Sequence, residues 1–142
     1  MKRSANAIWK GTLKDGSGSF GVASKAIVDQ KYSFRTRFED APGTNPEELI
    51  AAAHASCFSM ALSGKLEANG TPASRIETSA ACTVEKVGDA FAVTTMALTV
   101  RVSAAGIEND AFQALAAATK DGCPISKAIK GNVNITLDAQ LV

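Results

Sequence analysis

A long apolar segment, residues 46–68, most constrains how this chain can fold. Asn45 is a favourable N-cap, Pro46 suits the first helical position, and the two glutamates that follow stabilise the positive end of a helix dipole. Gly70 lies where such a helix ends. These signals predict a single helix over residues 46–68, roughly 34 Å long.

The middle of this helix is apolar nearly all round, so we expect it to be buried on more than one side. A chain of 142 residues has little else with which to cover such a helix. The sequence therefore predicts a homodimer in which the helix packs near its own symmetry mate.

Short strands are expected before the long helix. Apolar alternation and turn signals predict them over residues 7–13, 19–29 (as one or two strands) and 32–38. In the last of these, aromatic side chains alternate with Arg35 and Arg37, which places both arginines on one face of a strand.

The segment after the long helix alternates between strands and helices. The sequence predicts a hairpin of strands 75–87 and 91–103, helices over 108–121 and 123–131, and a closing strand over 133–141. This order predicts a single α+β domain over residues 1–142, with a largely antiparallel sheet packed against helices.

Composition limits the classes of partner. The 15 Lys and Arg residues nearly balance the 14 Asp and Glu residues, which favours neither nucleic acid nor an anionic membrane as a partner. The start of the chain lacks an apolar stretch of signal-peptide length, and the charge-free run over residues 49–64 is shorter than the ~20 apolar residues of a membrane span. We expect a soluble, cytoplasmic protein.

The cysteines indicate redox chemistry. Cys57 lies on the apolar helix, and Cys123 lies in a Gly-Cys-Pro turn at the start of a helix, where the helix dipole favours a thiolate. This arrangement suggests a nucleophile and its resolving partner, although a small apolar residue in a buried helix is the plainer interpretation of Cys57. Cys82 shares a strand face with Ile76 and Val84, so we interpret it as structural.

A thiol in the middle of a helix gains little from the helix dipole, so ionisation of Cys57 near neutral pH requires a nearby cation. His54, one turn earlier, is one candidate, and Arg35 and Arg37 are the others. The competing interpretations are a hydrogen-bonded core histidine and a solvated strand face, the latter for at least one of the two arginines.

Two other functions are compatible with parts of the sequence. His54 and the three cysteines total a Cys₃His zinc set, but they lack the usual paired C-x-x-C knuckle, so the pattern indicates a zinc or small-molecule binding module only weakly. A hotdog-type thioester hydrolase also wraps a sheet around a long helix and uses a helix carboxylate such as Glu47 or Glu48 as base. That function leaves Cys57 and the Gly-Cys-Pro turn unexplained.

Four motifs resemble those of the OsmC/Ohr family of thiol-dependent peroxidases. They are residues 36–39 (TRFE), 43–50 (GTNPEELI), 52–62 (AAHASCFSMAL) and 122–126 (GCPIS). The first motif and His54 resemble the OsmC branch more than the organic hydroperoxide resistance branch. The resemblance implies an intertwined homodimer, with antiparallel sheets wrapped around long central helices and active sites at the interface. It implies no metal or bound cofactor.

The resemblance also implies roles for four residues. Cys57 matches the peroxidatic cysteine, Cys123 the resolving cysteine, Arg37 the arginine near the thiolate, and Glu47 the glutamate that pairs with that arginine. The implied reaction reduces an organic hydroperoxide, and hydrogen peroxide more weakly, through a Cys57 sulfenic acid and a Cys57–Cys123 disulfide. An external dithiol, such as a dihydrolipoyl group, then reduces the disulfide.

Helix geometry limits how these residues meet. Glu47 and Cys57 are about 15 Å apart along one helix axis, so they do not touch within a chain. Either Arg37 spans this gap, or Glu47 and Arg37 reach Cys57 from the other subunit. Our hypothesis is the second arrangement.

Overall fold

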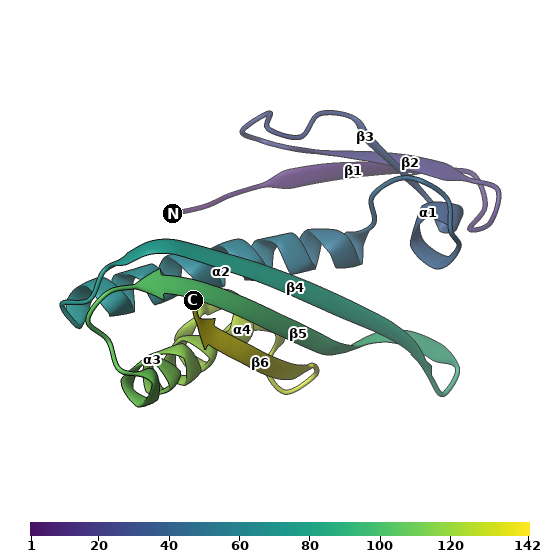
Figure 1. The fold of residues 1–142 in the computed structure, drawn as a ribbon. Helices are drawn as coiled ribbons and strands as arrows, with labels where there is room; N and C mark the ends of the chain where they lie inside the picture. Colours follow the sequence, from purple (N-terminus) through teal and green to yellow (C-terminus); the bar gives the residue numbers. More distant parts are fainter. The chain divides into compact units, whose positions relative to one another are not determined.

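The computed structural model describes all 142 residues and divides into two compact units, Met1–Leu49 and Ile50–Val142 (Figure 1). The N-terminal unit is an antiparallel meander in the order β1-β2-β3, followed by a short helix. Its elements are β1 (Ala5–Lys10), β2 (Ser17–Val22), β3 (Gln30–Ser33) and α1 (Phe34–Phe38).

The predicted strand over residues 32–38 is wrong, because most of this segment forms helix α1. Ser33 ends β3 and caps α1, because its Oγ accepts the Thr36 N–H at 3.2 Å while Thr36 Oγ1 accepts the Ser33 N–H at 3.0 Å. The Phe34 and Phe38 rings pack in a tilted arrangement with centroids 5.0 Å apart, which is the i,i+4 contact of a helix. A spacing of four residues between Phe34 and Phe38 fits one face of a strand and one face of a helix equally. The capping box of Ser33 and Thr36 favours the helix.

The expected strand over residues 25–29 is also wrong. These residues form the turn between β2 and β3, and Lys25 and Asp29 have positive φ angles of 61° and 48°. Such angles lie in the left-handed region and do not occur in a strand.

The long helix α2 spans Pro46–Ala68, as predicted. Asn45 Oδ1 accepts the Glu48 N–H at 2.8 Å, and Gly70 ends the helix with a φ angle of 79°. By length and composition α2 also qualifies as a membrane span, with a mean hydropathy of 1.2, but the core helix of a soluble protein passes the same test.

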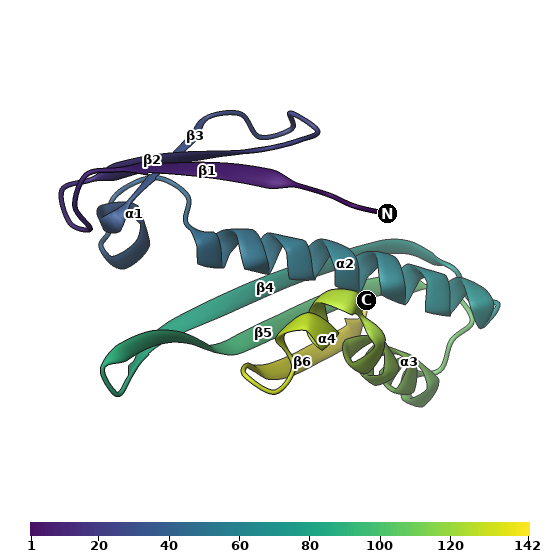
Figure 2. The ribbon, with the colours of Figure 1, turned by 180° about the vertical axis from the view of Figure 1, so that it is seen from behind.

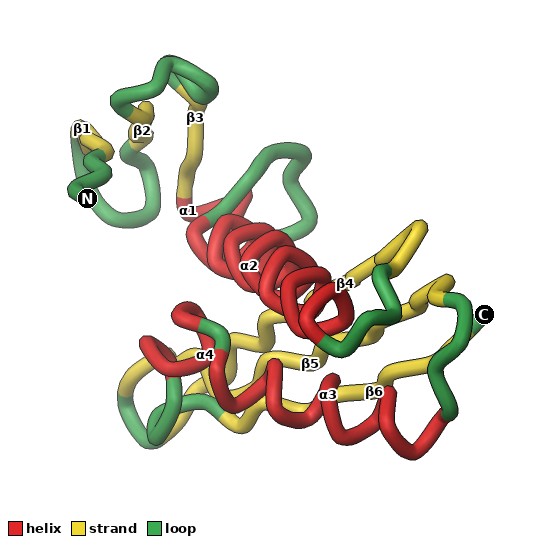
Figure 3. The backbone as a smooth tube through the Cα atoms, turned by 90° about the vertical axis from the view of Figure 1, so that its left-hand side faces the viewer, coloured by secondary structure: helices red, strands yellow, loops and turns green.

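The C-terminal unit places its helices on one face of a three-stranded sheet (Figure 2). Its other elements are β4 (Ala73–Val87), β5 (Ala90–Ala104), α3 (Asn109–Gly122), α4 (Pro124–Ile129) and β6 (Asn134–Leu141). Strands β4 and β5 form the predicted antiparallel hairpin, but β6 pairs with β5 in parallel. The pairing is parallel because α3 and α4 form a crossover that returns the chain to the end of the sheet where β5 began (Figure 3).

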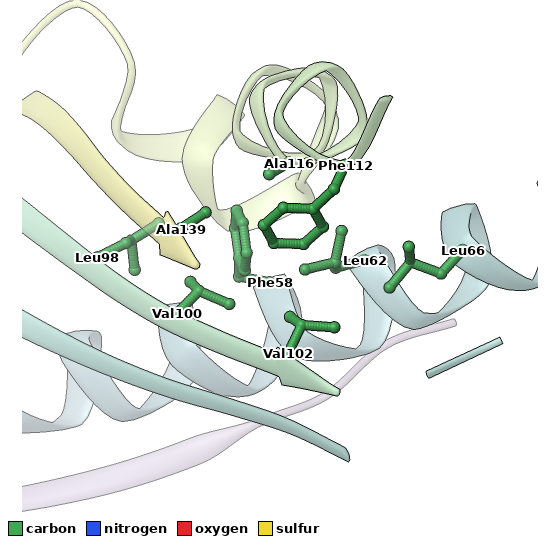
Figure 4. Packing of buried hydrophobic residues seen from close by; sticks show 9 residues of the cluster. All are labelled: Phe58, Leu62, Leu66, Leu98, Val100, Val102, Phe112, Ala116 and Ala139. Carbon is green, nitrogen blue, oxygen red and sulfur yellow. The ribbon is translucent and has the colours of Figure 1, made fainter. Parts of the chain in front are cut away.

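The core of this unit lies between α2, α3 and the sheet (Figure 4). Alternate residues of β5 point to the helices, as the period of two requires. The buried cluster comprises Phe58, Leu62 and Leu66 of α2, Leu98, Val100 and Val102 of β5, Phe112 and Ala116 of α3, and Ala139 of β6.

Within one chain, only one stripe of α2 is buried, and the opposite side is exposed. Met60 on that side is 76% exposed, and Val87 and Phe91 at the end of the long hairpin are 57% and 58% exposed. The single chain therefore does not supply the burial on several sides that the apolar sequence of α2 predicts.

We expect Leu62→Ala to lower the free energy of unfolding by about 2–5 kcal/mol, because Leu62 is fully buried between α2 and the sheet. The matched control is Ser63→Ala, which changes the next residue on the exposed side of α2 and should alter stability by less than about 0.5 kcal/mol. Denaturant unfolding followed by circular dichroism measures both. Equal effects of the two substitutions would show that the orientation of α2 is different.

Candidate active site

The structure brings together two cysteines that are 66 residues apart in the sequence. Cys57 Sγ on α2 lies 3.1 Å from Cys123 Sγ, which is between α3 and α4. A disulfide bond is about 2.05 Å long, so the two thiols are reduced and in contact. Little movement is needed for them to form a bond.

The backbone around Cys123 is fixed by the ends of two helices. Cys123 N–H donates to Thr119 O of α3 at 2.8 Å, and Cys123 O accepts the Lys127 N–H of α4 at 3.0 Å. Pro124 occupies the first position of α4, where its missing N–H costs nothing. The next two backbone N–H groups, of Ile125 and Ser126, lie in the first turn of α4 and favour a negative charge on the Cys123 sulfur.

These contacts affect the two thiols in opposite directions. Burial raises the pKa of Cys57, and its hydrogen bond with Cys123 raises it further. Burial also raises the pKa of Cys123, but the Ser126 N–H, the Cys57 thiol and the Ile125 N–H outweigh it, so the Cys123 pKa is lowered. The C-terminal unit alone therefore favours the negative charge on Cys123, and ionisation of Cys57 needs a further positive charge.

His54 does not supply that charge. Its ring is fully buried, and Nε2 lies 2.8 Å from Ser126 Oγ. Burial lowers the pKa of His54 below its usual 6.5, so the ring is neutral at pH 7. This agrees with a hydrogen-bonded core histidine and excludes His54 as the cation for Cys57.

The Cys₃His zinc set does not assemble. The chain contains no group of three or more His, Cys, Asp or Glu side chains placed to hold a metal. Cys82 shares a face of β4 with Ile76 and Val84, as predicted, but it is half-buried and lies outside the buried core.

The N-terminal unit holds the other two expected residues as an ion pair. Arg37 Nη2 lies 2.7 Å from Glu47 Oε1, and Arg37 Nε contacts both carboxylate oxygens at 3.1 and 3.2 Å. The Glu47 side chain is only 10% exposed, whereas Arg35 pairs with Glu39 on the open surface. Of these two pairs, only that of Arg37 combines bidentate geometry with a nearly buried carboxylate, which fixes the guanidinium in one place.

A small apolar cavity of about 220 Å³ adjoins Arg37 within the same unit. Aromatic and aliphatic side chains line it, and the Arg37 guanidinium lies 4.9 Å from the centre of the Phe38 ring. The lining residues are Trp9, Leu13, Tyr32, Ser33, Phe34, Arg37 and Phe38. Sequence reasoning did not find this cavity, because it depends on the contact between Trp9 and Tyr32, whose strands are separated by β2 in the sequence.

The chain is similar to known proteins over most of its length. Residues 38–138 match the family described as OsmC-like protein. Peroxiredoxin OsmC of Escherichia coli strain K12 is 46% identical over 142 residues, which cover 99% of this chain and 97% of that protein. Organic hydroperoxide resistance protein OhrA of Bacillus subtilis is 35% identical over 96 residues, 67% of this chain and 66% of that protein.

A solved structure supports the fold. The organic hydroperoxide resistance protein OhrB of Bacillus subtilis superimposes with a TM-score of 0.71 at 24% sequence identity, and the match covers 96% of this chain and 98% of that one.

We expect His54 to make stability depend on pH. Burial places its folded-state pKa below the unfolded value of 6.5, so the unfolded state binds the proton more readily. The contribution of His54 is therefore complete above pH 6.5 and is lost as the pH falls through and below that value, by at most about 1.4 kcal/mol per pH unit.

Denaturant unfolding at a series of pH values measures this loss. His54→Gln provides the control, because glutamine retains a hydrogen-bonding N–H and does not titrate. An unchanged pH dependence in His54→Gln would show that other groups cause it.

Proposed function

Because the chain belongs to the OsmC family of cysteine-based peroxidases, we propose that Cys57 reduces the peroxide and that Cys123 resolves the product. The observation that carries this proposal is the 3.1 Å contact between the two sulfurs, with Cys57 only partly buried and Cys123 fully buried. The accessible sulfur meets the substrate, and the buried sulfur is reached only by its neighbour.

The reaction follows from thiol chemistry. The Cys57 thiolate attacks the O–O bond, an alcohol leaves, and Cys57 becomes a sulfenic acid. Cys123 attacks that sulfur and releases water, which leaves a Cys57–Cys123 disulfide. An external dithiol, for which a dihydrolipoyl group is our candidate, restores both thiols by exchange. The thiols supply both electrons, so the reaction needs no bound cofactor.

The positive charge that Cys57 lacks is assigned to Arg37. The bidentate pair with the nearly buried Glu47 carboxylate holds this guanidinium in place, and a cation near a thiolate lowers the thiol pKa and stabilises the charge that develops on the leaving oxygen. We assign Arg37 and Glu47 of one subunit to the Cys57 of the other in a homodimer. The exposed apolar side of α2, including Met60, supports such an association.

Organic hydroperoxides are the preferred substrates in this proposal. The apolar cavity beside Arg37 suits an alkyl or aryl group, whereas hydrogen peroxide gains nothing from apolar walls. A thioester hydrolase is not favoured, because neither helix carboxylate is a free base. Both carboxylate oxygens of Glu47 accept hydrogen bonds from Arg37, and Glu48 accepts one from Thr44.

We assign residues 1–142 to one OsmC-like domain that acts in the cytoplasm. The family match over residues 38–138 crosses the boundary between the two compact units at residue 49, which supports a single domain.

We expect Cys57→Ser to lower the rate of cumene hydroperoxide consumption by a factor on the order of a thousand or more, because the nucleophile is removed. Cys123→Ser should complete one turnover and then stop, because its sulfenic acid has no resolving thiol. Cys82→Ser is the matched control and should keep most of the activity. The assay follows peroxide loss with dihydrolipoamide as reductant. For the unmodified protein, kcat/KM should be higher for cumene hydroperoxide than for hydrogen peroxide. Full activity in Cys57→Ser would refute the proposed role.

The trans arrangement predicts complementation. Chains carrying Cys57→Ser and chains carrying Arg37→Ala should each be inactive alone, and their mixed dimers should have one working site each. Arg35→Ala is the control for Arg37→Ala, since Arg35 pairs with Glu39 on the surface and its loss should leave activity nearly intact. Mixtures that remain inactive after dissociation and reassociation would place Arg37 and Cys57 in the same chain.

A further inference from the structure

Four side chains in the C-terminal unit form one continuous line of contacts. His54 Nε2 lies 2.8 Å from Ser126 Oγ, the Ser126 hydroxyl and N–H both favour a negative charge on the sulfur of Cys123, one helical turn earlier, and that sulfur lies 3.1 Å from Cys57 Sγ. His54 and Cys123 are fully buried, and Ser126 is 3% exposed. Of these four side chains, the function proposed above uses only the two cysteines and leaves His54 and Ser126 without a role.

The direction of these hydrogen bonds follows from a count of protons. A serine hydroxyl has one proton to donate, so it donates either to the histidine or to the sulfur. The second buried ring nitrogen, Nδ1 of His54, has no hydrogen-bond partner. Buried N–H groups without a partner are rarer than unpaired acceptors, so the single proton of the neutral ring belongs on Nε2, where Ser126 Oγ accepts it. The Ser126 proton is then directed to Cys123.

We propose that His54 and Ser126 are parts of the peroxidase site that act on its resolving step, by holding Cys123 as the thiolate that attacks the Cys57 sulfenic acid. Ser126, one helical turn after Cys123, stabilises the negative charge on the reacting sulfur, and His54 is a positioning residue that fixes the direction of the Ser126 hydroxyl. This inference rests on the proposed roles of Cys57 and Cys123.

The step is balanced without any further reactant. The Cys123 thiolate supplies an electron pair to the Cys57 sulfur, the S–S bond forms, and the S–O bond of the sulfenic acid breaks. The departing hydroxide takes up one proton and becomes water. That proton equals the one Cys123 released to solvent when it ionised, so no net charge accumulates in the site.

Ser126 also has a route to water. It lines a cavity of about 180 Å³ together with Lys120, Asp121 and Lys130, among others. Since one water occupies about 30 Å³ of liquid, this space holds several. Ser126 therefore lies between the buried Cys123 and a cavity with polar side chains in its lining.

The test separates the two chemical steps. Reduced protein receives one equivalent of cumene hydroperoxide, and samples quenched with dimedone over time are analysed by mass spectrometry for the Cys57 adduct and for the disulfide. In Ser126→Ala and His54→Leu we expect disulfide formation to slow by about ten- to a hundredfold, the effect of one hydrogen bond to a charged group, so the adduct accumulates. The backbone N–H groups remain in Ser126→Ala, so the change isolates the hydroxyl.

Conservative variants distinguish hydrogen bonding from packing. Ser126→Thr keeps the hydroxyl, and His54→Gln places an N–H the same number of bonds from the backbone, so both should close the disulfide much faster than Ser126→Ala and His54→Leu. Wild-type closure rates in a folded Ser126→Ala would overturn the proposal. Equal slowing by the conservative and non-conservative variants would overturn it as well, because it would indicate a packing role.

A second measurement does not depend on peroxide chemistry. In the Cys57→Ser, Cys82→Ser background, the ultraviolet absorbance of the Cys123 thiolate as a function of pH reports its thiolate fraction, and no reagent has to enter the core. We expect Ser126→Ala to move this profile to higher pH and Ser126→Thr to restore it, and an unmoved profile would overturn the proposal. Absence of a Cys57 adduct in every variant, with this shift still present, would instead count against the proposed function alone.

Discussion

The burial of one stripe of α2 against β5 and α3 is the interaction on which the rest of the structure depends. Phe58 follows Cys57 directly in the sequence and is fully buried, so it fixes the rotation of α2 about its axis. Phe112 and Ala116 fix α3 against the same stripe, and α3 ends at Cys123. The distance between the two sulfurs is therefore set by packing of apolar side chains, which resists change because interiors are close-packed.

The same packing has an electrostatic consequence. It buries Cys123 where two backbone N–H groups and a hydroxyl favour a negative charge on its sulfur, and it leaves Cys57 in the middle of a helix, where only one N–H does so. The thiol to which we assign the reaction with the peroxide is thus the one whose thiolate its own unit favours less. The ion pair of Arg37 and Glu47 belongs to the N-terminal unit, whereas both sulfurs belong to the C-terminal unit.

The sequence predicted those parts of the fold that are specified by residues close together in the chain. The caps of α2, the turn of the β4–β5 hairpin and the start of α4 at Pro124 are each specified within a few residues, and all were predicted from the sequence. Helix α1 was not, because the spacing of Phe34 and Phe38 fits two periods and the capping role of Ser33 was not recognised. The parallel pairing of β6 and the contact between His54 and Ser126, 72 residues apart, depend on tertiary structure that no local pattern encodes.

The apolar sequence of α2 and its single buried stripe connect the association of two chains with the ionisation of Cys57. A helix that is apolar all round is stable in water only if its remaining side is covered, and one chain leaves Met60 and its neighbours open. Cys57 lies on this helix and lacks a positive charge within its own unit. In the homodimer that we propose, a second copy covers the open side of α2 and brings Arg37 to Cys57. The proposal therefore makes ionisation of Cys57 depend on the same association that completes the core.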